Sequence, residues 1–226
     1  MTTIGIPVYP GVDLLDFAGP HEMFSWVNSS RNLPPGERID VQLLSEGAQE
    51  VTTRGDDVIV KGVTVKIAHS FADAGQFDVI WVPGGHPQSL RDIIQGQEPR
   101  PVIEFLKRQA AGARFVCSVC EGAMLLAAAG LLDCHKAPTH WAFIPCLKAY
   151  PNIDVVDGLP RFVESGNRLT GGGISSGLDE ALRLIELLTN RAVAEDVQRT
   201  TQYFPLPPVS ADVRVPDRCN FPGLGP

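Results

Sequence analysis

The sequence contains no apolar stretch long enough to cross a lipid bilayer. Its longest run of small or apolar residues covers residues 122–132, whereas a membrane-spanning helix needs about 20 such residues. Residues 1–7 contain neither a basic segment nor a long apolar region, so they do not resemble a secretory signal. Both absences favour a cytoplasmic protein without a membrane segment.

Basic residues are also scarce. The chain has 19 lysines and arginines against 26 aspartates and glutamates, which gives a net charge of −7. Nucleic acid and anionic lipid both need a basic face to pair with their phosphates, so the charge balance disfavours both as partners. A small molecule is the expected partner.

The five cysteines do not form a recognisable disulfide framework. An odd number of cysteines in a cytoplasmic protein favours reduced thiols. Cys117 and Cys120 are spaced as C-x-x-C, but no second such pair completes a four-cysteine zinc site. Their odd separation places them on opposite faces if the first lies in a strand, so we expect Cys117 to be core packing. The sequence assigns no role to Cys134, Cys146 or Cys219.

The order of short apolar segments and helical patterns predicts one α/β domain over residues 1–203. A chain of this length with 44% apolar residues can bury one substantial core. Strands alternate with helices, which predicts a mostly parallel sheet covered by helices on both faces. The expected strands are 4–8, 39–44 with further strands up to 67, 77–82, 114–119, 153–156, 161–164 and 168–170. The expected helices are 12–27, 89–94, 101–111, 123–132 and one that follows residues 171–173. Six prolines in residues 204–226 preclude regular structure and predict a tail laid over a surface or a partner subunit.

Two loops stand at the carboxyl ends of buried strands, where open parallel sheets bind ligands. The segment around Cys120 (Ser-Val-Cys-Glu-Gly) resembles a nucleophile elbow, in which a tight strand-to-helix turn exposes the nucleophile. A helix amino terminus is expected to lower the pKa of such a thiol. The backbone N–H groups of Glu121 and of Gly85, in the neighbouring loop, are candidate oxyanion donors. The alternative is that Cys120 is one more buried thiol.

Two further residues are candidates for proton transfer. Asp16 lies between apolar residues, where an unpaired carboxylate is costly and a raised pKa is expected; it could equally be a helix cap or a surface residue. His140 could serve Cys120 as a base, or could only begin a helix. The glycines of 171–173 precede a helix but lack the lysine and spacing of a Walker motif, so they indicate close backbone approach to a substrate or tight packing.

Taken together, these motifs resemble the ThiJ/PfpI superfamily over nearly the whole chain. The segments that carry the resemblance are Asp16 after the first strand, 82–85 (Val-Pro-Gly-Gly), 118–123 (Ser-Val-Cys-Glu-Gly-Ala), 139–141 (Thr-His-Trp) and 170–175 (Thr-Gly-Gly-Gly-Ile-Ser). The helix at 127–132 and the segment 203–208 are similar to the isocyanide (isonitrile) hydratase branch.

The resemblance implies a flavodoxin-like sheet, a homodimer and a reaction that needs neither cofactor nor metal. It implies Cys120 as the nucleophile and Asp16 as its carboxylate partner, with Gly172 and Ile174 lining the substrate site. The implied reaction is hydration of an isocyanide to an N-substituted formamide through a thioimidate on the sulfur.

One residue departs from the pattern of these hydratases, which usually carry Thr directly after the nucleophile. Here that position is Glu121, and an ionised carboxylate beside a thiolate disfavours both charges. Two alternatives therefore stay open. One is glyoxalase- or amidase-like chemistry at the same elbow, and the other is a thiol-based redox or ligand sensor. Direct regulation of transcription is not expected, because too few residues follow the last helix for a DNA-binding domain.

Overall fold

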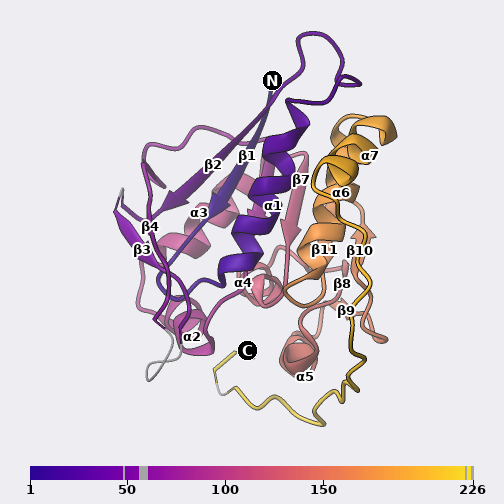
Figure 1. Ribbon diagram of the computed structural model, residues 1–226. Helices are drawn as coiled ribbons and strands as arrows, with labels where there is room; N and C mark the ends of the chain where they lie inside the picture. The colour runs from indigo at the N-terminus through magenta and orange to yellow at the C-terminus, as the bar shows by residue number, and fades with distance from the viewer. Residues whose placement is uncertain (48, 56–60, 222, 225–226) are drawn as a thin grey trace.

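A seven-stranded sheet forms the centre of the molecule (Figure 1). The computed structural model describes residues 1–47, 49–55, 61–221 and 223–224. In spatial order the strands are β10 (Phe162–Ser165), β11 (Arg168–Gly171), β7 (Phe115–Ser118), β6 (Val79–Val82), β1 (Thr2–Pro7), β2 (Ile39–Ser45) and β5 (His69–Ser70).

All neighbouring strands of this sheet run parallel except the hairpin of β10 and β11. Gly166 turns this hairpin with a φ of +61°. The central order β2-β1-β6-β7-β11 is the flavodoxin-like order, whose crevice lies at the carboxyl ends of the strands beside the first one. The predicted flavodoxin-like α/β fold is therefore confirmed.

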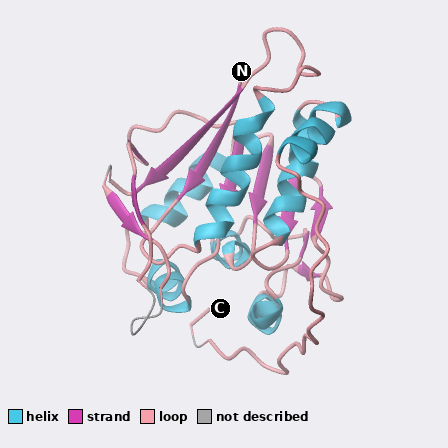
Figure 2. Cartoon of the chain, in the orientation of Figure 1, coloured by secondary structure: helices cyan, strands magenta, loops and turns pink. Residues whose placement is uncertain are grey.

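Helices cover both faces of the sheet (Figures 1 and 2). Three of them, α1 (Leu14–Val27), α6 (Ser176–Leu188) and α7 (Arg191–Thr200), pack against one another on one face. The opposite face carries α2 (Pro87–Gln95), α3 (Pro101–Ala110) and α4 (Gly122–Ala128). Within the described ranges, no helix is long and apolar enough to span a bilayer.

Several short elements lie outside the main sheet. The strands β3 (Glu50–Thr52) and β4 (Thr64–Lys66) pair antiparallel, and β8 (Lys136–Ala137) and β9 (Asp154–Val155) pair parallel. Part of the segment in which we expected strands up to residue 67, residues 56–60, lies outside the described residues. A 3-10 helix at Trp141–Phe143 and the short helix α5 (Ile144–Leu147) follow β8.

The helix after the elbow is shorter than predicted. It ends at Ala128, whereas the apolar pattern suggested a helix to residue 132. Gly130 adopts a φ of +70°, which a right-handed helix cannot accommodate, and its N–H donates to the carbonyl of Ala127. A left-handed glycine of this kind is a common way to end a helix.

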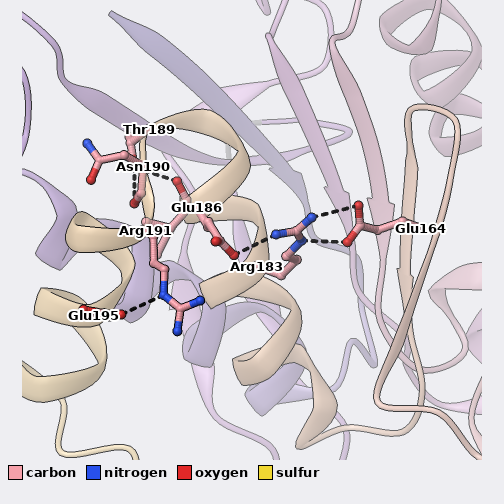
Figure 3. A network of polar contacts seen from close by, with 8 residues as sticks. Glu164, Arg183, Glu186, Thr189, Asn190, Arg191 and Glu195 are labelled. Carbon is pink, nitrogen blue, oxygen red and sulfur yellow. Dashed lines mark hydrogen bonds and ion pairs between the residues drawn. The ribbon is translucent and has the colours of Figure 1, made fainter.

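A polar network holds α6 against the edge hairpin (Figure 3). Arg183 on α6 donates to Glu164 of β10 at 2.6 and 3.3 Å, and to Glu186 on its own helix at 2.7 Å. Because these groups are partly exposed, each pair contributes at most about 1 kcal/mol. Together they link α6 to β10.

The tail after α7 has no helix or strand in its described residues and returns beneath the carboxyl edge of the sheet (Figure 1). It is anchored near its end, where Phe221 stacks on Phe143 with ring centroids 4.1 Å apart. The expectation of reduced thiols was wrong for one pair, because Cys146 and Cys219 form a disulfide. Sequence spacing could not show this pairing, because it depends on where an irregular segment crosses α5.

Candidate active site

The elbow between β7 and α4 places Cys120 on a strained backbone. The strand ends at Ser118 and the helix begins at Gly122, and Cys120 between them has a φ of +58°. A non-glycine residue in this left-handed region costs about 1–2 kcal/mol. A Cβ on Gly122 would collide with the carbonyl of Val82, so only glycine lets the turn pass this close to β6.

Four titratable side chains meet at this elbow. They are the carboxyl groups of Asp13, Asp16 and Glu121 and the thiol of Cys120, and one ligand atom from each lies within 4.8 Å of the others. All four residues are buried. The predicted partnership of Asp16 with Cys120 thus corresponds to a contact, but the contact belongs to a cluster of four groups rather than to a pair.

Three contacts fix the acids that follow β1. Asp16, in the first turn of α1, accepts a 2.9 Å hydrogen bond through Oδ2 from the N–H of Gly84. Its own carbonyl accepts a 3.0 Å hydrogen bond from the indole of Trp81. Asp13 precedes the helix and forms an ion pair with Arg54 at 3.6 Å. The loop after β6 and the segment after β3 therefore position these carboxyl groups.

Burial and mutual repulsion raise the pKa values of the clustered acids. Burial, followed by the charges of Glu121 and Asp13, raises the pKa of Asp16 well above its ordinary value, and the Gly84 N–H only partly opposes this. Burial raises the pKa of Glu121 to about 7. Desolvation also raises the pKa of Asp13, although Arg54 lowers it. The cluster therefore retains protons at neutral pH.

The expected lowering of the thiol pKa was wrong. Burial, followed by the charges of Asp16 and Glu121, raises the pKa of Cys120 well above its ordinary value, while the backbone amide of Ile174 lowers it. The helix α4 has seven residues, and its dipole cannot offset complete burial beside two acids. In the resting site, burial therefore favours the protonated forms of the thiol and of the acids beside it.

A cavity of about 390 Å³ lies beside the elbow. Gly172 and Ile174, which the resemblance placed at the substrate site, line it, and so does the candidate base His140. The carbonyl of Gly172 accepts a 2.7 Å hydrogen bond from the N–H of Cys120, and the hydroxyl of Thr139, another lining residue, donates to the carbonyl of Cys120 at 2.9 Å. The backbone of Cys120 is thus attached directly to the cavity wall, while its side chain is fully buried.

The candidate base His140 and the candidate oxyanion donor Gly85 occupy different positions in the fold. His140 begins the 3-10 helix, where its ring nitrogen accepts the N–H of Ala142 at 3.3 Å; among the described residues, no hydrogen bond joins it to Cys120. Gly85 pairs with Val12 in an isolated bridge. The glycine that contacts the acids is Gly84, since a Cβ there would meet both Glu121 and Asp16.

Sequence analysis missed several residues of this site. Asp13 and Arg54 extend the cluster, and the buried hydroxyl of Tyr9 donates to the carbonyl of Pro83 at 2.9 Å. The spacing of Asp13 and Asp16, three residues apart at the start of a helix, could have identified the first, because such residues lie on one face. Nothing in the sequence places Arg54 beside them.

Comparison with known proteins identifies the family of this chain. Residues 3–187 match the DJ-1/PfpI family. A curated relative, isonitrile hydratase from Pseudomonas putida, is 36% identical over 205 residues, which cover 91% of this chain and 80% of the relative. The chain belongs to the DJ-1/PfpI family.

Solved structures of other DJ-1/PfpI proteins share the fold. A ThiJ/PfpI family protein from Pseudomonas syringae superposes with a TM-score of 0.78 at 28% identity, over 95% of this chain and 81% of the other. DJ-1beta from Drosophila melanogaster gives a TM-score of 0.73 at 20% identity, over 89% of this chain and 97% of the other. At that identity the second likeness supports the fold alone.

A further buried acid lies behind the site of this DJ-1/PfpI chain. Glu180 on α6 is fully buried, and neither of its carboxyl oxygens has a hydrogen-bond partner among the described residues. It faces Gly171 and the similarly unpartnered hydroxyl of Ser176. Burial, followed by the charge of Asp16 on α1, raises the pKa of Glu180 well above its ordinary value. Cys117 lies nearby on β7, and burial, followed by the charge of Glu180, raises the pKa of its thiol well above the ordinary value.

We predict that the Glu180→Gln substitution makes the free energy of unfolding less dependent on pH. Because the pKa of Glu180 is raised in the folded state, the folded chain keeps a proton that the unfolded chain releases, and stability falls as pH rises above the ordinary glutamate range. Removing one such group lessens this slope by at most about 1.4 kcal/mol per pH unit. Urea unfolding at a series of pH values from 5 to 8 measures this slope of the free energy of unfolding against pH.

The matched control for this prediction is Glu37→Gln, which changes an exposed glutamate. Its stability profile should run parallel to that of the wild type. If the profile of Glu180→Gln also ran parallel to that of the wild type, Glu180 would not be held protonated by the fold.

Proposed function

We propose that this DJ-1/PfpI protein is a cysteine-dependent hydratase that converts a small isocyanide into an N-substituted formamide. The observation that carries the proposal is the placement of the Asp16 carboxyl group against the Cys120 thiol on a strained elbow. The 36% identity to an isonitrile hydratase over 91% of the chain supports the choice of substrate class.

In the first half of the reaction, the sulfur of Cys120 adds to the terminal carbon of the isocyanide. The thiol proton passes through Asp16 to the same carbon, so that a C–S bond and a C–H bond form and the product is a thioimidate. Proton transfer by a positioned carboxyl group accelerates a step of this kind by about 10²- to 10⁴-fold. A site that keeps its protons at rest suits a substrate that must accept one at carbon.

In the second half, water adds to the thioimidate carbon and the C–S bond breaks. The sulfur leaves as the thiol after taking back a proton, and the nitrogen receives the other, which releases an N-substituted formamide. Glu121 lies within the same cluster and is the second proton-transfer group in this proposal. Its pKa of about 7 allows it to accept or give a proton near neutral pH. Gly85 keeps its proposed role as a backbone N–H donor.

The cavity beside the elbow is the proposed entry for the substrate. Its lining includes the partly exposed apolar side chains of Trp141, Leu159, Ile174 and Val213, which suit the organic substituent of an isocyanide. Because Cys120 is fully buried in the single chain, the proposal includes a movement that opens a path from this cavity to the sulfur. The proposal also includes a homodimer. The apolar side chains of Leu14, Leu15 and Trp26 on α1 are exposed, and they suit contact with a second copy of the chain.

Product analysis tests the proposed function. Purified protein is incubated separately with an aryl isocyanide and with methylglyoxal, and the formamide and lactate formed are measured by chromatography. We expect formamide from the isocyanide, together with a mass increase on the Cys120 peptide equal to that of the substrate in rapidly quenched samples. Lactate alone would indicate glyoxalase-like chemistry instead. Absence of both products, with selective oxidation of Cys120 by peroxide to the sulfinic acid, would favour a redox sensor.

A further inference from the structure

The cluster of Asp13, Asp16, Glu121 and Cys120 contains more acid groups than the proposed hydration uses. That reaction needs one sulfur and two proton-transfer groups, whereas the structure brings three carboxyl groups and a thiol within 4.8 Å. Asp13 takes part in no step of the proposed hydration. Buried carboxyl groups are costly unless they are paired, protonated or bound to a cation, so a carboxyl group that the hydration leaves unused is available to a cation that displaces its proton.

The oxygens of the three carboxyl groups divide into anchored and free ones. Oδ2 of Asp16 accepts the N–H of Gly84 at 2.9 Å, and Oδ1 of Asp13 pairs with Arg54 at 3.6 Å. The other oxygen of each, and Oε2 of Glu121, are buried with no hydrogen-bond partner among the described residues. The side chains are at least nine-tenths buried. Metal sites are commonly built this way, with one ligand atom free and the rest of the side chain held by an outer partner.

We propose that Asp13, Asp16, Glu121 and Cys120 bind one divalent transition-metal cation of the zinc class. A thiolate selects zinc, cobalt or cadmium over magnesium and calcium, which prefer oxygen ligands alone. Four tetrahedral ligands of zinc lie about 3.5 Å apart, so the widest pair of the cluster must close by roughly 1 Å on binding. Rotation of the Asp13 and Glu121 side chains can supply this movement.

The cation has a short route to the cluster. The side chain of Arg54 is 44% exposed, and that of Asp13, with which it pairs, is 9% exposed. A divalent ion that arrives beside Arg54 can therefore replace the guanidinium as the partner of Asp13 without passing through the core. On binding, the thiol and the carboxyl groups release their protons to solvent.

Metal binding is distinct from the hydration and opposes it. A cation on the sulfur occupies the electron pair that would attack the isocyanide, so the metal-loaded protein should be inactive and a chelator should restore it. The sequence analysis expected no metal site, and the proposed reaction still uses none. Binding is measured without substrate, so failure of the hydratase proposal would leave this one standing.

Cobalt(II) is the probe that tests the site. The chelator-treated protein is titrated with cobalt chloride, excess metal is removed by gel filtration, and bound cobalt is counted by mass spectrometry. We expect one cobalt per chain and a sulfur-to-cobalt charge-transfer absorption in the near ultraviolet. Cys120→Ala should abolish the absorption, and Asp13→Asn, which keeps the shape of the side chain, should weaken cobalt binding at least tenfold. Both variants are checked for folding by circular dichroism.

Cys134→Ala serves as the matched control, because it removes the exposed free thiol and should leave the absorption unchanged. Three results would overturn the proposal. These are cobalt retained at well below one equivalent, an absorption that survives Cys120→Ala, and Asp13→Asn binding cobalt as tightly as the wild type. Each would show that these four side chains together do not bind the cation.

Discussion

Replacing Cys120 with alanine is expected to reduce formamide formation from an aryl isocyanide at least about a thousandfold, to the rate without protein. The sulfur makes the only covalent bond to the substrate in the proposed mechanism, and loss of a nucleophile removes the step that the rest of the site supports. The substitution also removes a buried sulfur and leaves the left-handed backbone in place, so the fold should persist with a modest loss of stability. Initial rates at saturating isocyanide measure the effect.

Cys117→Ala is the matched control, because it removes a fully buried thiol from the same strand-to-helix segment. It should lower the thermal midpoint by a similar amount and keep most of the activity. If Cys120→Ala retained more than about a tenth of the wild-type rate while Cys117→Ala behaved as expected, the sulfur of Cys120 would not be the nucleophile.

Asp16→Asn is expected to lower kcat/KM for the isocyanide by about 10²- to 10⁴-fold, the usual range for loss of a general acid or base. Asparagine keeps the size of the side chain and can still accept the hydrogen bond from Gly84. It cannot carry the thiol proton to the substrate carbon. Steady-state kinetics, with folding confirmed by circular dichroism, measure the loss.

The result is compared with Asp78→Asn, which changes an acid on the opposite, amino-terminal side of the sheet, where Asp78 accepts hydrogen bonds from Thr3. That variant should lose some stability and little activity. An Asp16→Asn enzyme within a few-fold of the wild type would exclude Asp16 as the proton carrier and would direct attention to Glu121.

The parts of the site that lie at strand ends could be predicted from the sequence. The runs of apolar residues before Gly84 and before Cys120 identify buried parallel strands, and parallel strands bring their carboxyl ends to one edge of the sheet. Asp16 follows β1, which is the neighbour of β6 in this topology. Its contact with Gly84, in the loop after β6, therefore follows from strand order.

The electrostatics of the site could not be predicted in the same way. The helix that follows Cys120 suggested a lowered thiol pKa, but the result depends on how completely the sulfur is buried and on how many acids surround it. Asp13 and Arg54 come together through a segment that follows β3, outside the main sheet. The disulfide of Cys219 depends on the path of an irregular tail. These are properties of packing, and periodicity does not encode them.

The positive φ of Cys120 has a consequence for how relatives of this protein can diverge. Holding a side chain in that conformation reduces the stability of the fold, and glycine at the same position would recover about 1 kcal/mol. A lineage that no longer needed the sulfur would therefore gain from losing it, whereas one that kept the chemistry would tolerate the loss of stability. The positive φ at this turn should therefore be kept with a cysteine only where the reactive sulfur is needed, at a cost in the stability of the fold.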